Sequence, residues 1–144
     1  MRHPVNTNEV SIWQLLCRYC HLLDRGDTAA VVNLFHPEGT LIFPPNPPAK
    51  GHSEVQKIYE KWMRTARAPT VWLRHNISTP LIDVNDTRAT AISYFTADFL
   101  LRKKNRIHAL VGRYQDRLKH HDDQWLFWQR EILVDSRLDL GEPV

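Results

Sequence analysis

The sequence predicts one α+β domain, in which three N-terminal helices pack on a strongly curved, mainly antiparallel sheet. In the first half, apolar residues recur at spacings of three and four, as in amphipathic helices. After Pro69, long strand-like segments alternate with short polar breaks. These segments lie near 74–84, 87–102, 106–119 and 124–137. With 144 residues, the chain is expected to form a single domain over residues 1–144.

The first predicted helix begins after Asn6 and ends at Gly26. Asn6 with Glu9 matches a capping box, in which two side chains satisfy free amides at a helix start. Glycine is common just past a helix end because it adopts the left-handed conformation at little cost. A short second helix is expected over residues 28–35.

A short strand over residues 39–45 and a stiff loop precede the third predicted helix. The loop "PPNPP" cannot pair within a sheet, because proline has no amide hydrogen. Ser53 with Gln56 indicates another capping box, and apolar residues then continue at helical spacing until just before Pro69. A curved sheet closed by helices encloses a cavity, which is a natural ligand site.

Charge and hydropathy argue against nucleic-acid and membrane partners. The net charge is +3 and the pI about 9.0, but the basic residues are scattered. Their one cluster, "RKKNR" at residues 102–106, falls between two strand-like segments and is expected to be a hairpin tip. No apolar run approaches the roughly 18 residues of a membrane span, and the N-terminus shows no signal-peptide pattern. We therefore expect a cytoplasmic protein.

The motif "CRYCH" matches the pattern of covalent haem attachment, but its context does not fit. It lies inside an apolar helix, and no export signal precedes it. A second C-x-x-C pair, which a zinc site of this type needs, is also missing from the sequence. We therefore expect Cys17 and Cys20 to pack as small hydrophobic residues.

The stretch "VWLRHNISTPLIDV" (residues 71–84) places a histidine at the head of a predicted strand. A solvated strand end is the simple interpretation, and a pocket lined by a general base is the functional one. His75 shares one strand face with Ile77 and Thr79. The alternation along the sheet is mixed, so it does not decide which face points inward. Pro80 indicates a bulge or an edge strand.

Two carboxylates occupy unusual positions. Asp98 interrupts the apolar stretch "SYFTADFLL", where a carboxylate must be paired, solvated or neutral. Asp24 lies at the C-terminal end of the first predicted helix, where the helix dipole disfavours an anion. It is therefore exposed or held by a cation. Tyr19 is five residues earlier, about 140° round an ideal helix, so it meets Asp24 only if the helix end deforms.

Four stretches, taken in order, resemble the SnoaL-like branch of the nuclear-transport-factor-2-like superfamily. They are "YCHLLDRGD" (19–27), "LFHPEGTLIF" (34–43), "RHNISTPLIDVNDTRATAISYF" (74–95) and "GRYQDRLKHHDDQWLFWQREILVD" (112–135). The resemblance covers nearly the whole chain and implies a cone-shaped α+β barrel with a deep apolar pocket. Enzymes of this superfamily include scytalone dehydratase, bile-acid dehydratase, polyketide cyclases and ketosteroid isomerase. The resemblance implies that no metal and no organic cofactor is needed.

The resemblance also implies roles for individual residues. Asp24 and His75 match the acid–base pair of the dehydratases, while Tyr19 and Asp98 match polar pocket positions of the bile-acid dehydratase type. A last-strand arginine of that type has no clean counterpart, because Arg130 and Arg137 are out of register. A tyrosine hydroxyl can stabilise a developing enolate oxygen. The residues expected to contact substrate are Phe43, Trp62, Trp72, Tyr94, Tyr114 and Arg130.

The predicted function is that of a cofactor-independent dehydratase, isomerase or cyclase. Its substrate is expected to be a hydrophobic, polycyclic or polyketide-like small molecule, and the protein a homodimer or homotrimer through the exposed sheet face. Two alternatives stay open. The C-terminal half also resembles the β subunits of ring-hydroxylating dioxygenases, which are structural partners of an iron-bearing subunit. A non-catalytic small-molecule binding protein would keep the pocket without proton transfer.

Overall fold

The structure, a computed structural model, describes residues 6–144, so the first five residues of the predicted domain lie outside it. The helices are α1 (Thr7–Arg25), α2 (Thr28–Val32) and α3 (Gly51–Trp62), the last continued by a π-helical turn, η1 (Met63–Arg67). The strands are β1 (Phe35–Ile42), β2 (Ala49–Lys50), β3 (Thr70–Asn85), β4 (Arg88–Leu101), β5 (Arg106–His121) and β6 (Gln124–Gly141).

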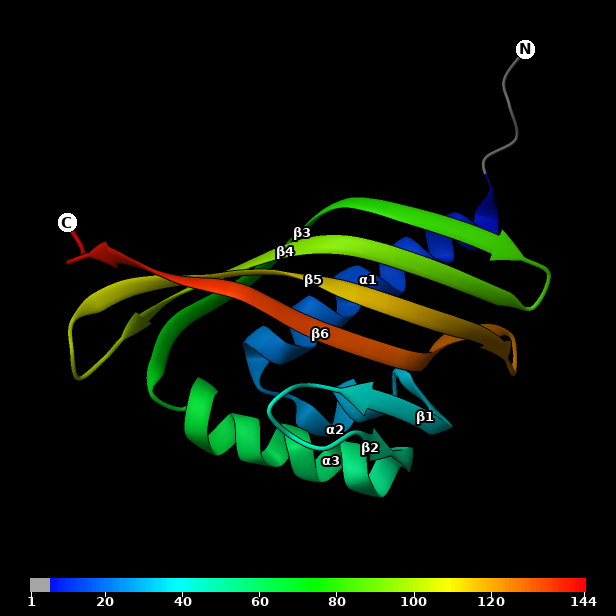
Figure 1. Ribbon diagram of the computed structural model, residues 1–144, viewed down its shortest axis with the longest axis horizontal. Coiled ribbons are helices and arrows are strands. Elements are labelled where there is room, and N and C mark those ends of the chain that lie inside the picture. Colours follow the sequence, from blue (N-terminus) through cyan, green and yellow to red (C-terminus); the bar gives the residue numbers. More distant parts are fainter. Residues whose placement is uncertain (1–5) are drawn as a thin grey trace, which may run out of the picture.

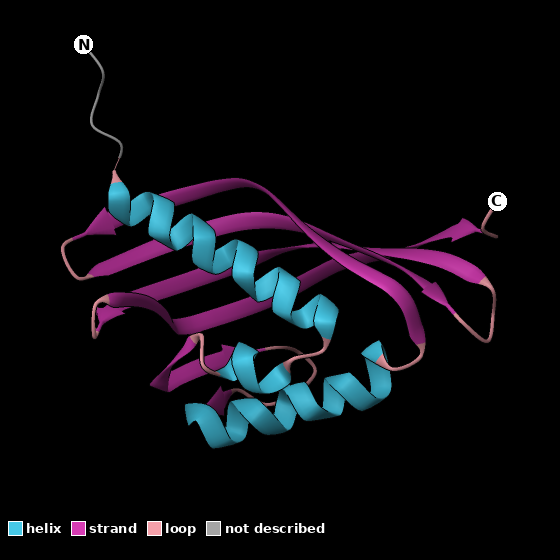
Figure 2. Cartoon of the chain, turned by 180° about the vertical axis from the view of Figure 1, so that it is seen from behind, coloured by secondary structure: helices cyan, strands magenta, loops and turns pink. Residues whose placement is uncertain are grey.

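The six strands form one curved sheet in the order β2-β1-β6-β5-β4-β3 (Figure 1). All neighbours are antiparallel except β1 and β6, which run parallel. Helix α1 crosses one face of the sheet, and α2 and α3 lie beside β1 and β2 (Figure 2). The prediction of an α+β fold with helices on a curved, mainly antiparallel sheet is confirmed.

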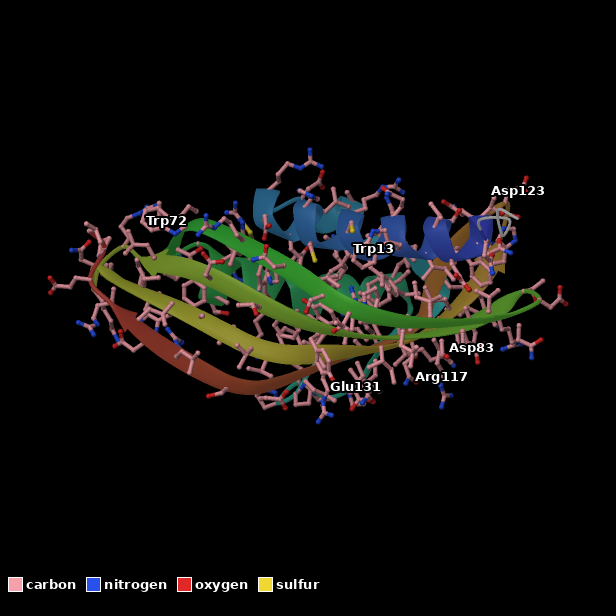
Figure 3. The ribbon with its side chains drawn as sticks, turned by 90° about the horizontal axis from the view of Figure 1, so that it is seen from above. Trp13, Trp72, Asp83, Arg117, Asp123 and Glu131 are labelled. Atoms are coloured by element: carbon pink, nitrogen blue, oxygen red, sulfur yellow. The ribbon has the colours of Figure 1, made fainter. Side chains whose placement is uncertain are left out.

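The two faces of the sheet differ sharply in burial. Along β4 the odd-numbered residues from Ala89 to Phe99 are buried beneath the helices, and the even-numbered ones are exposed or half-buried. Arg117 and Glu131 also lie on the side away from α1 (Figure 3). Three large apolar residues are exposed on neighbouring strands: Leu81, Ile92 and Tyr94. Assembly through this outer face stays a prediction.

Both ends of α1 form as the sequence predicts. Asn6 Oδ1 accepts the amides of Asn8 at 3.1 Å and Glu9 at 3.4 Å. Gly26 ends the helix in the left-handed conformation with φ 76°. A side chain there would be strained, and its Cβ would also approach Arg67 Nε to 3.0 Å.

Two local predictions are wrong. The second helix ends at Val32, and residues from Phe35 onward already form β1. Ser53 does not cap the third helix, because α3 begins at Gly51 and has no side-chain cap. Instead the Lys50 amide donates to Glu54 Oε2 at 2.7 Å, so a carboxylate satisfies the helix start.

Strand β3 is irregular on either side of His75. Its register with β4 shifts between Val71 and Arg74, and again between Ser78 and Leu81. The second shift includes Pro80, so the predicted bulge is confirmed. The bulges divide this long edge strand, and the segment between them runs beside the C-terminal end of α1.

The cysteines are free thiols, with Cys20 buried and Cys17 half-buried. Burial raises the pKa of Cys20 to about 12, which is the behaviour of a packed thiol rather than a reactive one. Over residues 6–144, no helix is long and apolar enough to span a membrane.

Candidate functional site

Asp24 and His75 form the polar centre of the site. The Nδ1 atom of His75 lies 2.7 Å from Asp24 Oδ1. The backbone amide of His75 also donates to both carboxylate oxygens, at 3.2 and 3.1 Å. Because a carboxylate only accepts, Nδ1 carries the proton and Nε2 is left as the basic atom. The side chains are 9% and 21% exposed for His75 and Asp24, so the pair is shielded but reachable.

The protein compensates for an anion at a helix C-terminus. The guanidinium of Arg67 donates to the backbone carbonyls of Asp24 at 2.6 Å and of Leu23 at 3.3 Å. This cation neutralises the negative end of the helix dipole. The side chain of Asp24 points away from the helix end to edge strand β3. There it accepts the backbone amide of His75, which would otherwise lack a partner. The Asp24 carboxylate was predicted to be exposed or held by a cation; it is held instead by the ring and the amide of His75, and Arg67 contacts only the backbone.

His75 lies where two cavities meet. A small inner cavity of about 40 Å³ reaches the core aromatic residues, and an outer pocket of about 220 Å³ opens towards the end of the sheet. Both are lined by His75, Trp62 and Leu110. Apart from His75, the inner cavity has hydroxyl groups but no charged group in its lining. A ligand in this space would therefore meet one base in largely apolar surroundings.

Three tyrosines line the inner cavity, and two of them form a hydroxyl pair. Tyr19 and Tyr59 are buried, and their hydroxyl oxygens are 2.7 Å apart. When two hydroxyls bond to each other, one hydrogen remains free to donate to a third atom. Burial raises the pKa of Tyr19 to about 12, so its hydroxyl stays protonated at neutral pH. The pair can therefore act as a hydrogen-bond donor to a ligand oxygen.

A sealed ion pair lies behind these tyrosines. Arg130 Nε and Nη2 donate to Asp116 at 2.9 and 3.2 Å, and both side chains have no solvent exposure. The guanidinium carbon lies 4.0 Å from the Tyr19 ring centroid and 3.8 Å from that of Tyr114. Burial raises the pKa of Asp116 to about 6, although the nearby guanidinium acts in the opposite direction. The pair is therefore ionic at neutral pH and supports the aromatic wall of the inner cavity.

Several predicted site residues do come together. Tyr19 and His75 both line the inner cavity, although helix α1 continues undeformed to Arg25 and Tyr19 does not bond to Asp24. The cavity is also lined by three of the predicted substrate contacts, Phe43, Trp62 and Tyr114. Arg130 is one layer further back and does not line either cavity.

Three predicted pocket residues lie elsewhere. Asp98 pairs with Arg74 on the sheet face opposite His75, because it occupies an even, outward position of β4. Tyr94 has the same parity and is 56% exposed. Trp72 is 46% exposed, in the β3 bulge at the end of the sheet beyond α1 (Figure 3). The prediction that these three residues line the pocket is therefore wrong.

The sequence interpretation missed Tyr59 and Asp116. Tyr59 belongs to the apolar stripe of the third helix, so nothing distinguished its hydroxyl from those of other core tyrosines. Asp116 shares one strand face with Tyr114 and Leu118, a period-two signal of an inward carboxylate that was available in the sequence. No group of three or more metal-ligating side chains is present in the described part of the chain.

The fold and this site define a class of small α+β cones with a shielded acid–base pair at an apolar pocket. The family model for SnoaL-like domains matches residues 7–131. The chain therefore belongs to the SnoaL-like family, within the nuclear-transport-factor-2-like superfamily, as the resemblance predicted. The sequence has no significant match among curated proteins.

Solved structures with the same fold include enzymes. A protein assigned as a scytalone dehydratase from Novosphingobium aromaticivorans is 24% identical, with a TM-score of 0.81 over 96% of this chain and 93% of that one. A hexachlorocyclohexane dehydrochlorinase, LinA type 2, is 12% identical, with a TM-score of 0.78 over 94% and 90%. A protein assigned as an aromatic ring hydroxylase, also from Novosphingobium aromaticivorans, is 16% identical, with a TM-score of 0.79 over 96% of both chains. At these identities the likeness shows the fold.

Proposed function

We propose that this protein is a cofactor-independent acid–base enzyme, most simply a lyase that removes water or another small leaving group from a compact apolar molecule. The observation that carries the proposal is the 2.7 Å contact between Asp24 and His75 at the junction of two apolar cavities. Histidine readily takes up and releases a proton near neutral pH, and the carboxylate fixes the tautomer that leaves Nε2 basic.

In the proposed reaction, His75 Nε2 takes a proton from the carbon next to a substrate carbonyl. The C–H electron pair moves into the C–C bond, and the carbonyl becomes an enolate. The Tyr19–Tyr59 hydroxyl pair donates a hydrogen bond to the enolate oxygen. The enolate then reforms the carbonyl and expels a β-hydroxyl, which leaves as water with the proton from the imidazolium. Returning the proton to another carbon would give an isomerase, so one site supports both outcomes.

The size and lining of the space limit the substrate. The outer pocket, at about 220 Å³, is smaller than the roughly 300–1,000 Å³ of drug-sized sites. Its walls include Trp62, Leu73 and Phe99, which favour an aromatic or alicyclic ligand of about two rings. A polyketide-like or larger polycyclic substrate would have to extend through the open end of the pocket.

The test needs only a generic ketone. Exchange of the α-hydrogens of 1-tetralone with D₂O, followed by proton NMR, reports proton abstraction next to a carbonyl. Wild type is expected to accelerate the exchange over buffer, and His75→Gln to lose about 10²–10⁴-fold of that acceleration. Arg74→Gln is the matched control, because it changes the neighbouring residue on the opposite sheet face. An exchange rate that is unchanged in His75→Gln would overturn the proposal.

The alternative of a structural subunit predicts a different behaviour. A chain that only supports a large catalytic partner has no need of a carboxylate-oriented histidine, so His75→Gln would leave its function intact. A binding protein would take up 1-tetralone without exchanging its hydrogens. The same NMR experiment therefore separates an enzyme from both alternatives.

A further inference from the structure

One basic side chain of the outer pocket has no part in the reaction proposed above. Arg137 lines the pocket together with His75, and these are its only charged or titratable lining groups. The strand register places them at the two ends of one transverse row. His75 pairs with Ala97, Ala97 with Leu110, and Leu110 with Arg137. Two apolar residues thus form a floor between a base and a cation.

The guanidinium of Arg137 is positioned but not neutralised. Its Nε donates to His108 Nδ1 at 3.2 Å, and its central carbon is 5.5 Å from the Phe99 ring centroid. No carboxylate within residues 6–144 lies at salt-bridge distance from it. Asp139, the next acidic residue along β6, instead accepts two hydrogen bonds from Arg106 at 3.0 Å.

The histidine partner holds Arg137 without cancelling its charge. Because an arginine N–H can only donate, His108 Nδ1 must be the acceptor, while its Nε2 is buried without a partner in the described part of the chain. The two terminal nitrogens of Arg137 have no hydrogen bond to other residues in the described part of the chain. A planar fork of this kind suits a carboxylate or a similar oxyanion, which it binds through two parallel hydrogen bonds.

We propose that Arg137 anchors an anionic group of the substrate, so that the substrate class is a compact ring compound with a carboxylate or similar oxyanion at one end. This inference rests on the proposed function, since it places the reacting carbon at His75. Three strand spacings separate the two residues, roughly 14 Å along the sheet backbone. Both residues line the outer pocket, His75 at its shielded end and Arg137 at its exposed end, so the anion would lie about two rings away from the reacting carbon.

Isothermal titration calorimetry with a pair of isosteric probes tests the anchor. Biphenyl-4-carboxylate and biphenyl-4-carboxamide have the same rings and differ in charge. Wild type is expected to bind the carboxylate up to about fivefold more tightly than the amide, because Arg137 is exposed and water screens its charged hydrogen bonds. Arg137→Gln should abolish this preference and leave amide binding unchanged. Arg137→Lys should restore part of it, since an ammonium supplies charge without the fork.

Arg113→Gln is the control for overall charge. Arg113 comes from neighbouring strand β5, is exposed and pairs loosely with Asp135 at 3.9 Å, and it lines neither cavity. Its removal should leave the preference intact. Equal binding of both probes by wild type would show that Arg137 does not anchor an anion, although the apolar pocket binds a ligand. An equal loss of the carboxylate preference in Arg137→Gln and Arg113→Gln would show the same. Failure of wild type to bind either probe would overturn the anchor and the apolar pocket together, whereas 1-tetralone exchange reports on His75 alone.

Discussion

Asp24 and Asp116 each hold a basic side chain on the helix-covered side of the sheet, but their surroundings differ. Asp24 contacts His75 at the junction of two cavities and keeps 21% of its side chain exposed. Asp116 contacts Arg130 among aromatic rings, and neither side chain has any exposure. The sealed pair cannot meet a ligand or exchange its proton with one. A carboxylate paired with a basic side chain therefore indicates catalysis only where a cavity reaches the pair.

Breaking the sealed pair should have the largest effect. Arg130→Met leaves the Asp116 carboxylate buried without a partner, which should lower the free energy of unfolding by about 3–5 kcal/mol. The double variant Asp116→Leu/Arg130→Met removes both charges and should recover most of that loss, as chemical denaturation would measure. A double variant as unstable as the single one would mean that the shape of Arg130, rather than its charge, holds the aromatic wall.

An exposed pair of similar geometry gives the control. Arg106 donates to Asp139 at 3.0 Å, but the two side chains are about half exposed. Arg106→Met should therefore leave the unfolding free energy nearly unchanged, because water replaces the lost partner.

The tyrosine pair lies between the two regions and should show an intermediate effect. Tyr59→Phe leaves the Tyr19 hydroxyl buried without its partner at 2.7 Å, which should cost about 1–3 kcal/mol in unfolding free energy. Tyr19→Phe/Tyr59→Phe removes both hydroxyls and should be more stable than either single variant. If the single variants are as stable as wild type, water from the cavity satisfies the remaining hydroxyl, and the pair is open to ligand as well.

Changing the open pair should affect stability least. His75→Gln keeps the backbone amide of residue 75, which donates to both oxygens of Asp24, and water can take the place of the ring. We expect a change in unfolding free energy of less than about 1 kcal/mol, together with the large loss of proton exchange predicted above. A loss of several kcal/mol in a thermal or chemical melt would instead assign His75 a structural role.

The sequence predicts most of the fold, because its signals are local. The long strands, their breaks and both ends of α1 follow from periodicity and capping chemistry over a few residues. The parallel pairing of β1 with β6 does not, because it joins segments about 90 residues apart without a local signal. The Ser53 capping box fails because Gly51 starts α3 earlier, which places Ser53 inside the first turn.

The site is harder to predict, because a carboxylate in a strand has two faces available. Asp98 lies between apolar residues and points outward, whereas Asp116 lies between Gln115 and Arg117 and points inward with Tyr114 and Leu118. The local alternation therefore separates these two carboxylates, but the mixed alternation of β3 does not place His75. The contact of Asp24 with His75, 51 residues apart, came from the family resemblance and not from any pattern in the chain.

The central claim is that Asp24 acts through His75, and a double-mutant cycle on 1-tetralone exchange tests it most directly. Wild type, Asp24→Asn, His75→Gln and the double variant would be compared under one set of conditions. Groups that act as one unit lose their effect together, so the double variant should be no slower than His75→Gln alone. Losses that multiply, or a wild type no faster than buffer, would contradict the account.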